Sequence, residues 1–327
     1  MSGSSLSSAT STFDNHRYKT TWDSVIPKSN RKLKYSDAEW LLRCKLAAGY
    51  RVAHNFGWTQ NIFNHITAKV PESEHELDGP HFLINPLGLR FDEVTACSLI
   101  KVTLDGKLKD NGTNAGPLFR QGFVIHASVH AVRHDITCVW HCHHEESAAI
   151  SMTKTGILPL CQEAISILPL VAYHPFEGTA NDMSEQPRIQ SNLGPRKRIL
   201  ILDNHGPLTL GRTVDESFTL MYGVCRSCSY QQKAMAAVGC DLSKLSIPTQ
   251  KELEDMSSRA KMQKYKDGKG VDSSSELVFR AMARVAEDYY GASNIYDIEE
   301  ATIESGMHTT TTSTKSGPQG NKLISSL

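Results

Sequence analysis

Two histidines separated by a single residue are the clearest chemical feature of this chain. His141 and His143 lie in the segment VWHCHHEE, which is typical of the end of a β-strand. Residues two apart on a strand point to the same side, so both imidazoles can reach one cation. Imidazole nitrogens bind zinc and other divalent transition metals. The pair is therefore a candidate metal site, although with 14 histidines in the chain this spacing also arises by chance.

A third histidine strengthens the metal hypothesis. His205 lies at the end of a second expected strand, residues 198–203, and is followed by Gly206. Because glycine has no Cβ, the backbone there can approach another segment closely. Three histidine ligands leave an open position for water or substrate, as in catalytic zinc sites. A divalent metal ion is the expected cofactor, with zinc as the first choice, but the spacing leaves open the alternative that His205 is only a polar turn residue.

Glu163 is the candidate catalytic acid or base. It lies in an otherwise apolar stretch, where a carboxylate is expensive to bury unless it has a partner. The alternative is an exposed glutamate in the first turn of a helix, where the helix dipole favours a negative charge. Three further histidines, His126, His130 and His134, recur every four residues on one helix face, and packing or surface roles are favoured for them.

The elements that must position these residues alternate between helices and short strands. Ser36 and Glu39 form a capping-box pattern before a helix, and Thr213 and Glu216 form a second one before a helix that runs to about residue 238. Short apolar runs between about 57 and 108 predict strands joined by turns. The other expected elements are helices at 119–133, 145–152 and 273–290 and a strand at 136–141.

Composition limits the classes of partner and compartment. The 35 basic and 35 acidic residues balance, so no bulk charge favours nucleic acid or an anionic membrane. The most apolar window, residues 156–173, contains Gln162, Glu163 and two prolines, and no membrane-spanning segment is expected. Eight scattered cysteines fit a reducing compartment, so a cytoplasmic location is expected.

Four regions are expected along the chain. Residues 1–33 and 306–327 are rich in Ser, Thr and Lys without an apolar period, and both are expected to be disordered tails. Residues 34–262 form the expected main domain. Residues 263–305 are more polar but contain the predicted helix 273–290, and they are expected to form an appended helical arm.

Several segments between residues 36 and 262 carry a family resemblance. The segments are CKLAAGYRVAHNFGWTQNIFNHITAKV, FLINPLGLRFDEVTACSLIKVTLDG, QGFVIHASVHAVRHDITCVWHCHH, LPLVAYHPFEG and NLGPRKRILILDNHGPLTLGRTVDESF. In these segments the chain resembles the class II aldolase and adducin superfamily, and the adducin head domain most closely. The resemblance implies an α/β fold with three layers, α/β/α, around a mostly antiparallel central sheet, and assembly as a tetramer. It also implies that His141, His143 and His205 are the metal ligands.

The chain departs from the family's sugar-phosphate enzymes at one important position. Those enzymes carry a catalytic glutamate four residues before the histidine that matches His126, and this chain has Gly122 there. Glycine has no carboxylate to move a proton, so that aldolase mechanism cannot run unchanged. Adducins look similar to Gln121-Gly122-Phe123 at this point.

Two other site assignments follow from the resemblance. A related branch, the methylthioribulose-phosphate dehydratases, uses a glutamate that is similar to Glu163, and adducins carry one there too. The family's phosphate-binding loops loosely match this chain at Asn64, Thr67 and Gly88, which become candidate substrate-binding residues. The bulky neighbours His65 and Leu87 argue against phosphate binding there.

Two functions are compatible with these features. The favoured one is a non-catalytic, adducin-like oligomeric scaffold that contacts actin and spectrin in the cytoplasm, at the cytoskeleton or the cytoplasmic face of the plasma membrane. The chain ends at Leu327 without the Lys-rich segment of adducins, so tail-based actin binding is expected to be reduced. The alternative is a divalent-metal-dependent lyase, of aldolase or dehydratase type, that acts on a (phospho)sugar-like hydroxy-ketone. The retained histidines favour the enzyme, and Gly122 favours the scaffold.

Overall fold

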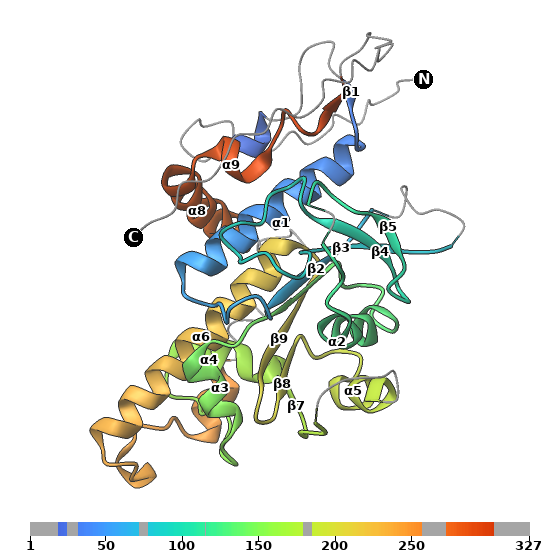
Figure 1. Cartoon of the computed structure of the whole chain (residues 1–327). Helices are drawn as coiled ribbons and strands as arrows, with labels where there is room; N and C mark the ends of the chain where they lie inside the picture. Colours follow the sequence, from blue (N-terminus) through green and yellow to red (C-terminus); the bar gives the residue numbers. More distant parts are fainter. Residues whose placement is uncertain are drawn as a thin grey trace, which may run out of the picture.

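The structure, a computed structural model, describes residues 19–24, 32–71, 78–114, 116–178, 185–256 and 273–303 (Figure 1). Its α-helices are α1 (Asp37–Asn55), α2 (Arg120–His130), α3 (Glu145–Ser151), α4 (Gln162–Ile167), α5 (Gln186–Leu193), α6 (Val214–Ala237), α8 (Ser273–Tyr290) and α9 (Ala292–Tyr296). Residues 250–256 are also helical. Short 3-10 helices are η2 (Thr21–Asp23), η4 (Leu168–Leu170) and η6 (Leu242–Lys244). The strands are β1 (Lys32–Leu33), β2 (His65–Lys69), β3 (His81–Ile84), β4 (Ile100–Thr103), β5 (Leu108–Asp110), β6 (Cys138–His141), β7 (Val171–His174), β8 (Ile199–Leu202), β9 (Gly206–Gly211) and β10 (Thr302–Ile303).

One eight-stranded sheet organises the molecule. Its strand order is β5-β4-β3-β2-β6-β9-β8-β7, and β1 pairs with β10 in a separate two-stranded sheet. Within the eight-stranded sheet every pairing is antiparallel except that of β7 with β8. The central sheet is therefore mostly antiparallel, as expected.

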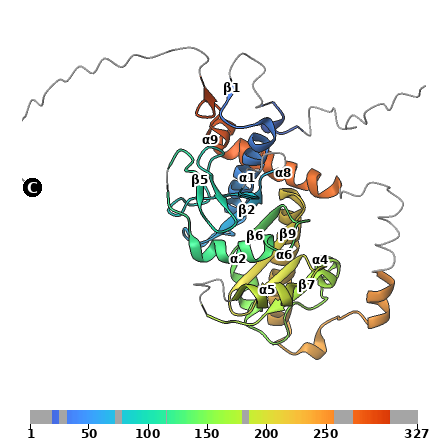
Figure 2. The ribbon, with the colours of Figure 1, turned by 90° about the vertical axis from the view of Figure 1, so that its right-hand side faces the viewer.

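Helices cover both faces of this sheet. Successive side chains of β6 point to opposite faces, so Cys138 and Trp140 join the core formed with α1, α6 and α8, whereas Val139 joins the core formed with α2 and α5. His141 follows the same alternation and points to the α2 side. Figures 1 and 2 show α1 and α6 on one side of the sheet and α2 and α5 on the other. The three-layer α/β/α prediction is confirmed.

The two predicted helix starts are present, and the glutamate of each capping pattern forms ion pairs that the sequence did not predict. Ser36 accepts a hydrogen bond from the backbone N–H of Glu39 at 3.1 Å, and Thr213 accepts one from Glu216 at 3.2 Å. These caps satisfy N–H groups that have no partner within the helix. The Glu39 carboxylate pairs with Lys101 of β4 at 3.0 Å, and the Glu216 carboxylate pairs with Arg198, next to β8, at 2.7 Å. The caps therefore begin the helices while their glutamates tie the helices to neighbouring elements.

Part of the expected N-terminal tail is packed. Trp22 in η2 is only 1% exposed, and its ring stacks on Phe279 of α8 at 5.9 Å between centroids. The prediction of disorder is therefore wrong for residues 19–24. The polar composition of the segment does not indicate that its one large aromatic side chain, Trp22, is buried against α8. Residues 1–18 and 25–31, and the whole predicted tail 306–327, lie outside the described residues.

The predicted C-terminal helix exists but is part of the main core. Helix α8 packs against α1 and α6, and α9 packs against α1 (Figure 2). Phe279, Ala283 and Tyr296 belong to the same buried cluster as the α1 and α6 residues. The description of 263–305 as an appended arm is corrected for residues 273–303, because their apolar face completes this core. Residues 257–272 lie outside the described part of the chain.

Among the helices that the structure describes, none combines the length and the apolar character needed to cross a lipid bilayer.

Candidate metal centre

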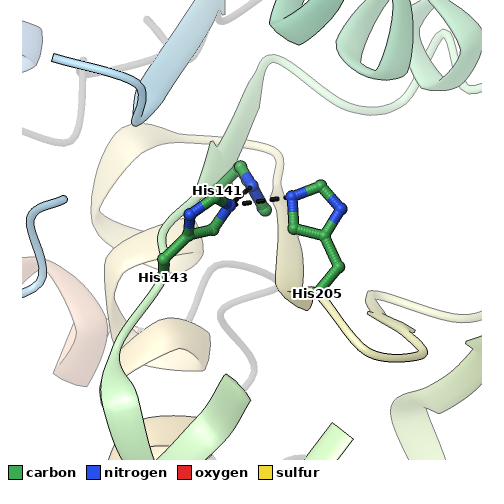
Figure 3. Close-up of side chains that lie close together, drawn as sticks. All are labelled: His141, His143 and His205. Atoms are coloured by element: carbon green, nitrogen blue, oxygen red, sulfur yellow. Dashed lines mark hydrogen bonds between the residues drawn. The ribbon is translucent and has the colours of Figure 1, made fainter. Parts of the chain in front are cut away.

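Three imidazole rings converge at one end of the sheet. His141 is the last residue of β6, His143 follows two residues later, and His205 lies in the turn between β8 and β9. The Nε2 atom of His143 lies 2.8 Å from Nε2 of His141 and 2.8 Å from Nε2 of His205 (Figure 3). These are side chains whose nitrogens could hold one metal ion together. The structure thus brings together the three histidines that the sequence predicted as ligands.

The turn between β8 and β9 has the local features that place His205 in this position. Asn204 adopts a left-handed conformation with φ of 57°, which asparagine tolerates better than most residues. A Cβ at Gly206 would lie 2.9 Å from the carbonyl oxygen of Cys142. Only glycine fits at this distance without movement, as the sequence predicted, so the turn can lie directly against the end of β6.

Two neighbouring acceptors fix which nitrogen of each ring carries its proton. Nδ1 of His141 lies 3.0 Å from the carbonyl oxygen of Pro207, which can only accept, so Nδ1 is the donor. His143 Nδ1 contacts the side-chain oxygen of Gln60 and is likewise the donor. In the neutral rings both Nε2 atoms then carry lone pairs that face each other. A cation between them removes the repulsion, so this donor set fits a divalent metal ion.

Burial keeps these imidazoles neutral. Desolvation, followed by the nearby imidazoles, lowers the pKa of His141 well below its usual value. Desolvation likewise lowers the pKa of His143 to about 4. His205 also has a lowered pKa because of burial, although the charge of Glu185 opposes this effect. Metal-binding histidines must be unprotonated, so the rings are ready for an ion at neutral pH.

A cavity of about 350 Å³ opens beside the three histidines. His65 of β2 and the start of α2 form part of its wall, and the segment after β7 forms another part. Its size lies at the lower end of the range of small-molecule sites. The arrangement can therefore place a small ligand next to a metal ion.

The sequence comparisons agree with this fold and site. Residues 44–232 match the family model described as "Class II Aldolase and Adducin N-terminal domain". The chain belongs to this class II aldolase and adducin family. A protein of Caulobacter vibrioides, provisionally named an aldolase class 2 protein, is 42% identical over 216 residues, which cover 65% of this chain and 80% of that protein.

Two further relatives come from the adducin branch and from the solved structures. Rat (Rattus norvegicus) alpha-adducin is 43% identical over 212 residues, which cover 65% of this chain but only 28% of the adducin. This chain therefore matches less than a third of the length of that relative. The crystal structure of an aldolase II superfamily protein from Pseudomonas syringae has a TM-score of 0.68 and 36% identity, and the alignment covers 80% of this chain and 98% of that one.

At the position of the catalytic glutamate in the aldolases of this family, the structure places an imidazole against the glycine. A Cβ on Gly122 would come closer than 3.0 Å to the ring of His65. His65 Nδ1 lies 2.7 Å from Nε2 of His126, and Thr67 Oγ1 lies 2.8 Å from Nδ1 of His126 and 2.9 Å from Nε2 of His130. The packing role expected for His126 and His130 is confirmed. His65 occupies the space that a glutamate at position 122 would need.

The other predicted site residues are not brought to the cavity. Glu163 lies in the first turn of α4, outside the lining, where its charge suits the helix N-terminus. The expected acid–base role for Glu163 therefore has no geometric support within one chain. Thr67 is fully buried among the histidines, Asn64 is buried near Trp58, and Gly88 does not line the cavity. None of these three residues reaches this cavity within one chain, and their role in substrate binding stays a prediction.

Several residues of the site escaped sequence reasoning. Glu185 lines the cavity, and its carboxylate accepts from Nε2 of His174 at 3.1 Å. The amide nitrogen of Asn192 lies 2.8 Å from Nδ1 of His174, so Nδ1 accepts and Nε2 carries the proton. His174 and Glu185 also form a group with Glu177 that could hold a metal ion, but these contacts already use both ring nitrogens. The sequence signal that could have identified this pair is His174, which directly precedes the segment PFEG.

Proposed function

We propose that this chain binds a divalent metal ion, with zinc as the first choice, through His141, His143 and His205. We propose further that it acts as a metal-dependent lyase on a small hydroxy-ketone. The convergence of the three Nε2 atoms supports this, because the partners of His141 and His143 turn unprotonated nitrogens toward one point. A bound divalent ion would act as a Lewis acid on a substrate carbonyl.

The residues around the histidines supply orientation and proton transfer. Gly122 offers no carboxylate, whereas Glu185 lines the same cavity and is held by the N–H of His174. We propose that the Glu185 carboxylate accepts or returns the substrate proton, with His174 as the residue that positions it. The Gln60 side chain and the Pro207 carbonyl keep the ligand rings in the tautomer that binds metal.

Metal analysis and a substrate screen test this proposal together. Protein purified without chelator should contain about one metal ion per chain, and His143→Ala should lose it. Turnover of a panel of free and phosphorylated hydroxy-ketones should disappear with chelator and in His205→Ala. His134→Ala is the matched control, because His134 is an exposed histidine outside the cavity. A metal-loaded protein with no turnover on the whole panel would contradict the lyase function.

A second function has its own supporting observation. The 43% identity with alpha-adducin extends over 212 residues. The family resemblance also implies that adducins look similar to Gln121-Gly122-Phe123 at the position of the aldolase glutamate. We propose as the alternative a tetrameric, adducin-like scaffold in the cytoplasm that binds actin and spectrin at the cytoskeleton. Sedimentation with filamentous actin and with spectrin should then show binding that His143→Ala does not change. Absence of binding to both would count against the scaffold.

A further inference from the structure

The charged side chains that line the cavity are acidic. Glu177, Glu185 and Asp203 lie in its wall, and none of the lining residues that the structure describes is a lysine or an arginine. Arg188 pairs with Glu177, with 2.8 Å between Nε and Oε1, and is not part of the lining. A phosphate ester carries nearly two negative charges at neutral pH, so it would meet like charge at Glu185 and Asp203.

The start of α2 is the feature of the cavity that could attract an anion, because helix N-termini present free N–H groups. Gln121 and Gly122 of its first turn reach the lining. Aromatic rings surround them, because the His65 ring lies against Gly122 and the Phe119 ring is 5.8 Å from that of His65. At the N-terminus of α2 a ligand therefore meets aromatic rings, not hydroxyl groups that could donate hydrogen bonds to a phosphate.

Exposed aromatic side chains form another part of the same cavity. Phe63 is 46% exposed and Phe176 is 59% exposed, although large apolar side chains are normally buried. The rings of Phe63 and Phe119 lie 5.9 Å apart. Phe176 reaches the lining from the segment after β7. An apolar group in the cavity would cover these rings and gain contact area with them.

These observations point to a substrate class. We infer that the site takes an unphosphorylated hydroxy-carbonyl compound whose far end is apolar or aromatic and packs against Phe63, Phe119 and Phe176. The inference rests on the proposed metal-dependent function and deepens it. The head of the substrate lies at the histidines, and the carboxylates of the wall reject a phosphate at the far end.

Three chelating probes separate the head of the ligand from its far end. Acetohydroxamate carries the metal-binding head alone, 3-phenylpropanohydroxamate adds an aromatic arm, and phosphoglycolohydroxamate adds a phosphate. Calorimetric titration of the zinc-loaded full chain at fixed ionic strength should give the aromatic probe at least about tenfold tighter binding than acetohydroxamate. The phosphate probe should bind no more tightly than acetohydroxamate.

Variants test which side chains contact the aromatic arm of the probe and how the charge of the cavity wall affects the phosphate probe. Phe63→Ala and Phe176→Ala should each weaken the aromatic probe severalfold and leave acetohydroxamate unchanged. Tyr289→Ala, which removes an aromatic side chain that is 76% exposed on α8, should change neither. Glu177→Lys places a cation in the wall and should tighten the phosphate probe about tenfold.

The outcomes are distinct for the two proposals. If acetohydroxamate does not bind, the metal-dependent function fails and this inference fails with it. If acetohydroxamate binds and the phosphate probe binds more tightly than the aromatic probe, the inference on substrate class alone is overturned. The inference on substrate class would also be overturned if the aromatic probe bound Phe63→Ala and Phe176→Ala as tightly as the native chain.

Discussion

His65 occupies the space in front of Gly122. A Cβ at position 122 would come closer than 3.0 Å to Nε2 of the His65 ring, and that ring is held from its other side by His126 at 2.7 Å. An imidazole on β2 and a side chain on α2 are therefore mutually exclusive at this point. A glutamate at position 122, which the resemblance implies for the family's aldolases, would therefore compete with the His65 ring for this space.

Restoring a glutamate should therefore destabilise the protein. Gly122→Glu forces the side chain against the His65 ring, and overpacking of a buried site costs about 2 kcal/mol or more. His65→Ala should relieve the clash, so the double variant should be more stable than the sum of the two single effects by about 1 kcal/mol or more. Urea unfolding of the four proteins measures this coupling.

The neighbouring position provides the control for that experiment. Gln121→Glu adds the same carboxylate in the same helical turn, but at an exposed position. Its free energy of unfolding should stay within about 0.5 kcal/mol of the native value. If Gly122→Glu is as stable as Gln121→Glu, the exclusion between His65 and position 122 does not exist.

Gln60 should control metal affinity without being a ligand. Its side-chain oxygen accepts from Nδ1 of His143 and holds Nε2 unprotonated toward the other two rings. Loss of such a partner typically lowers metal affinity about tenfold or more. Gln60→Leu should therefore bind zinc about tenfold more weakly in competition with a chromogenic chelator. Gln162→Leu, at an exposed position of α4, should match the native protein, and equal affinity of Gln60→Leu would contradict this role.

Local patterns predicted most of the elements and the metal ligands. The capping residues Ser36 and Thr213 start their helices because cap chemistry depends only on nearby residues. The i, i+2 spacing of His141 and His143 indicated their convergence, although β6 ends at His141, and Gly206 marked the close approach of the third ligand. The order of layers came from the family resemblance, since no local pattern fixes it.

Contacts between distant segments were beyond sequence reasoning. The conflict between His65 and Gly122 depends on β2 lying beside β6 and under α2, and the pairing of His174 with Glu185 depends on how the chain returns after β7. Glu163 looked functional because its neighbours are apolar, but apolar neighbours also surround the first turn of a packed helix such as α4.

His130 should make the protein sensitive to acid. Desolvation, with a smaller contribution from the charge of Lys69, lowers the pKa of His130 to about 3. In the unfolded chain its pKa is about 6.5. Above pH 6.5 neither state binds the proton, so the stabilisation is complete. As the pH falls toward 3, the unfolded state binds a proton that the folded state excludes, and stability decreases by up to about 1.4 kcal/mol per pH unit.

Comparison of two histidine variants isolates this contribution. His130→Gln keeps a polar group near the Thr67 hydroxyl but removes the titration. Its free energy of unfolding should therefore fall less steeply between pH 6.5 and pH 4.5, by up to about 1.4 kcal/mol per pH unit, which corresponds to one bound proton. His134→Gln changes an exposed histidine in the turn after α2 and should keep the native slope. Equal slopes for His130→Gln and the native chain would show that His130 does not titrate as its burial requires.

Trp22 should contribute to the stability of the whole domain, although it lies in a segment whose composition predicts disorder. Its ring stacks on Phe279 at 5.9 Å and meets Tyr296 edge-on at 6.4 Å, so it joins the N-terminal segment to α8 and α9. Removal of a fully buried tryptophan leaves a large cavity, and Trp22→Ala should lower the free energy of unfolding by about 3 kcal/mol or more. Trp22→Phe should lose clearly less, because it keeps one ring against Phe279. Thermal and urea unfolding measure both variants. A loss below about 0.5 kcal/mol for Trp22→Ala would mean that the segment contributes no more than an exposed tail does.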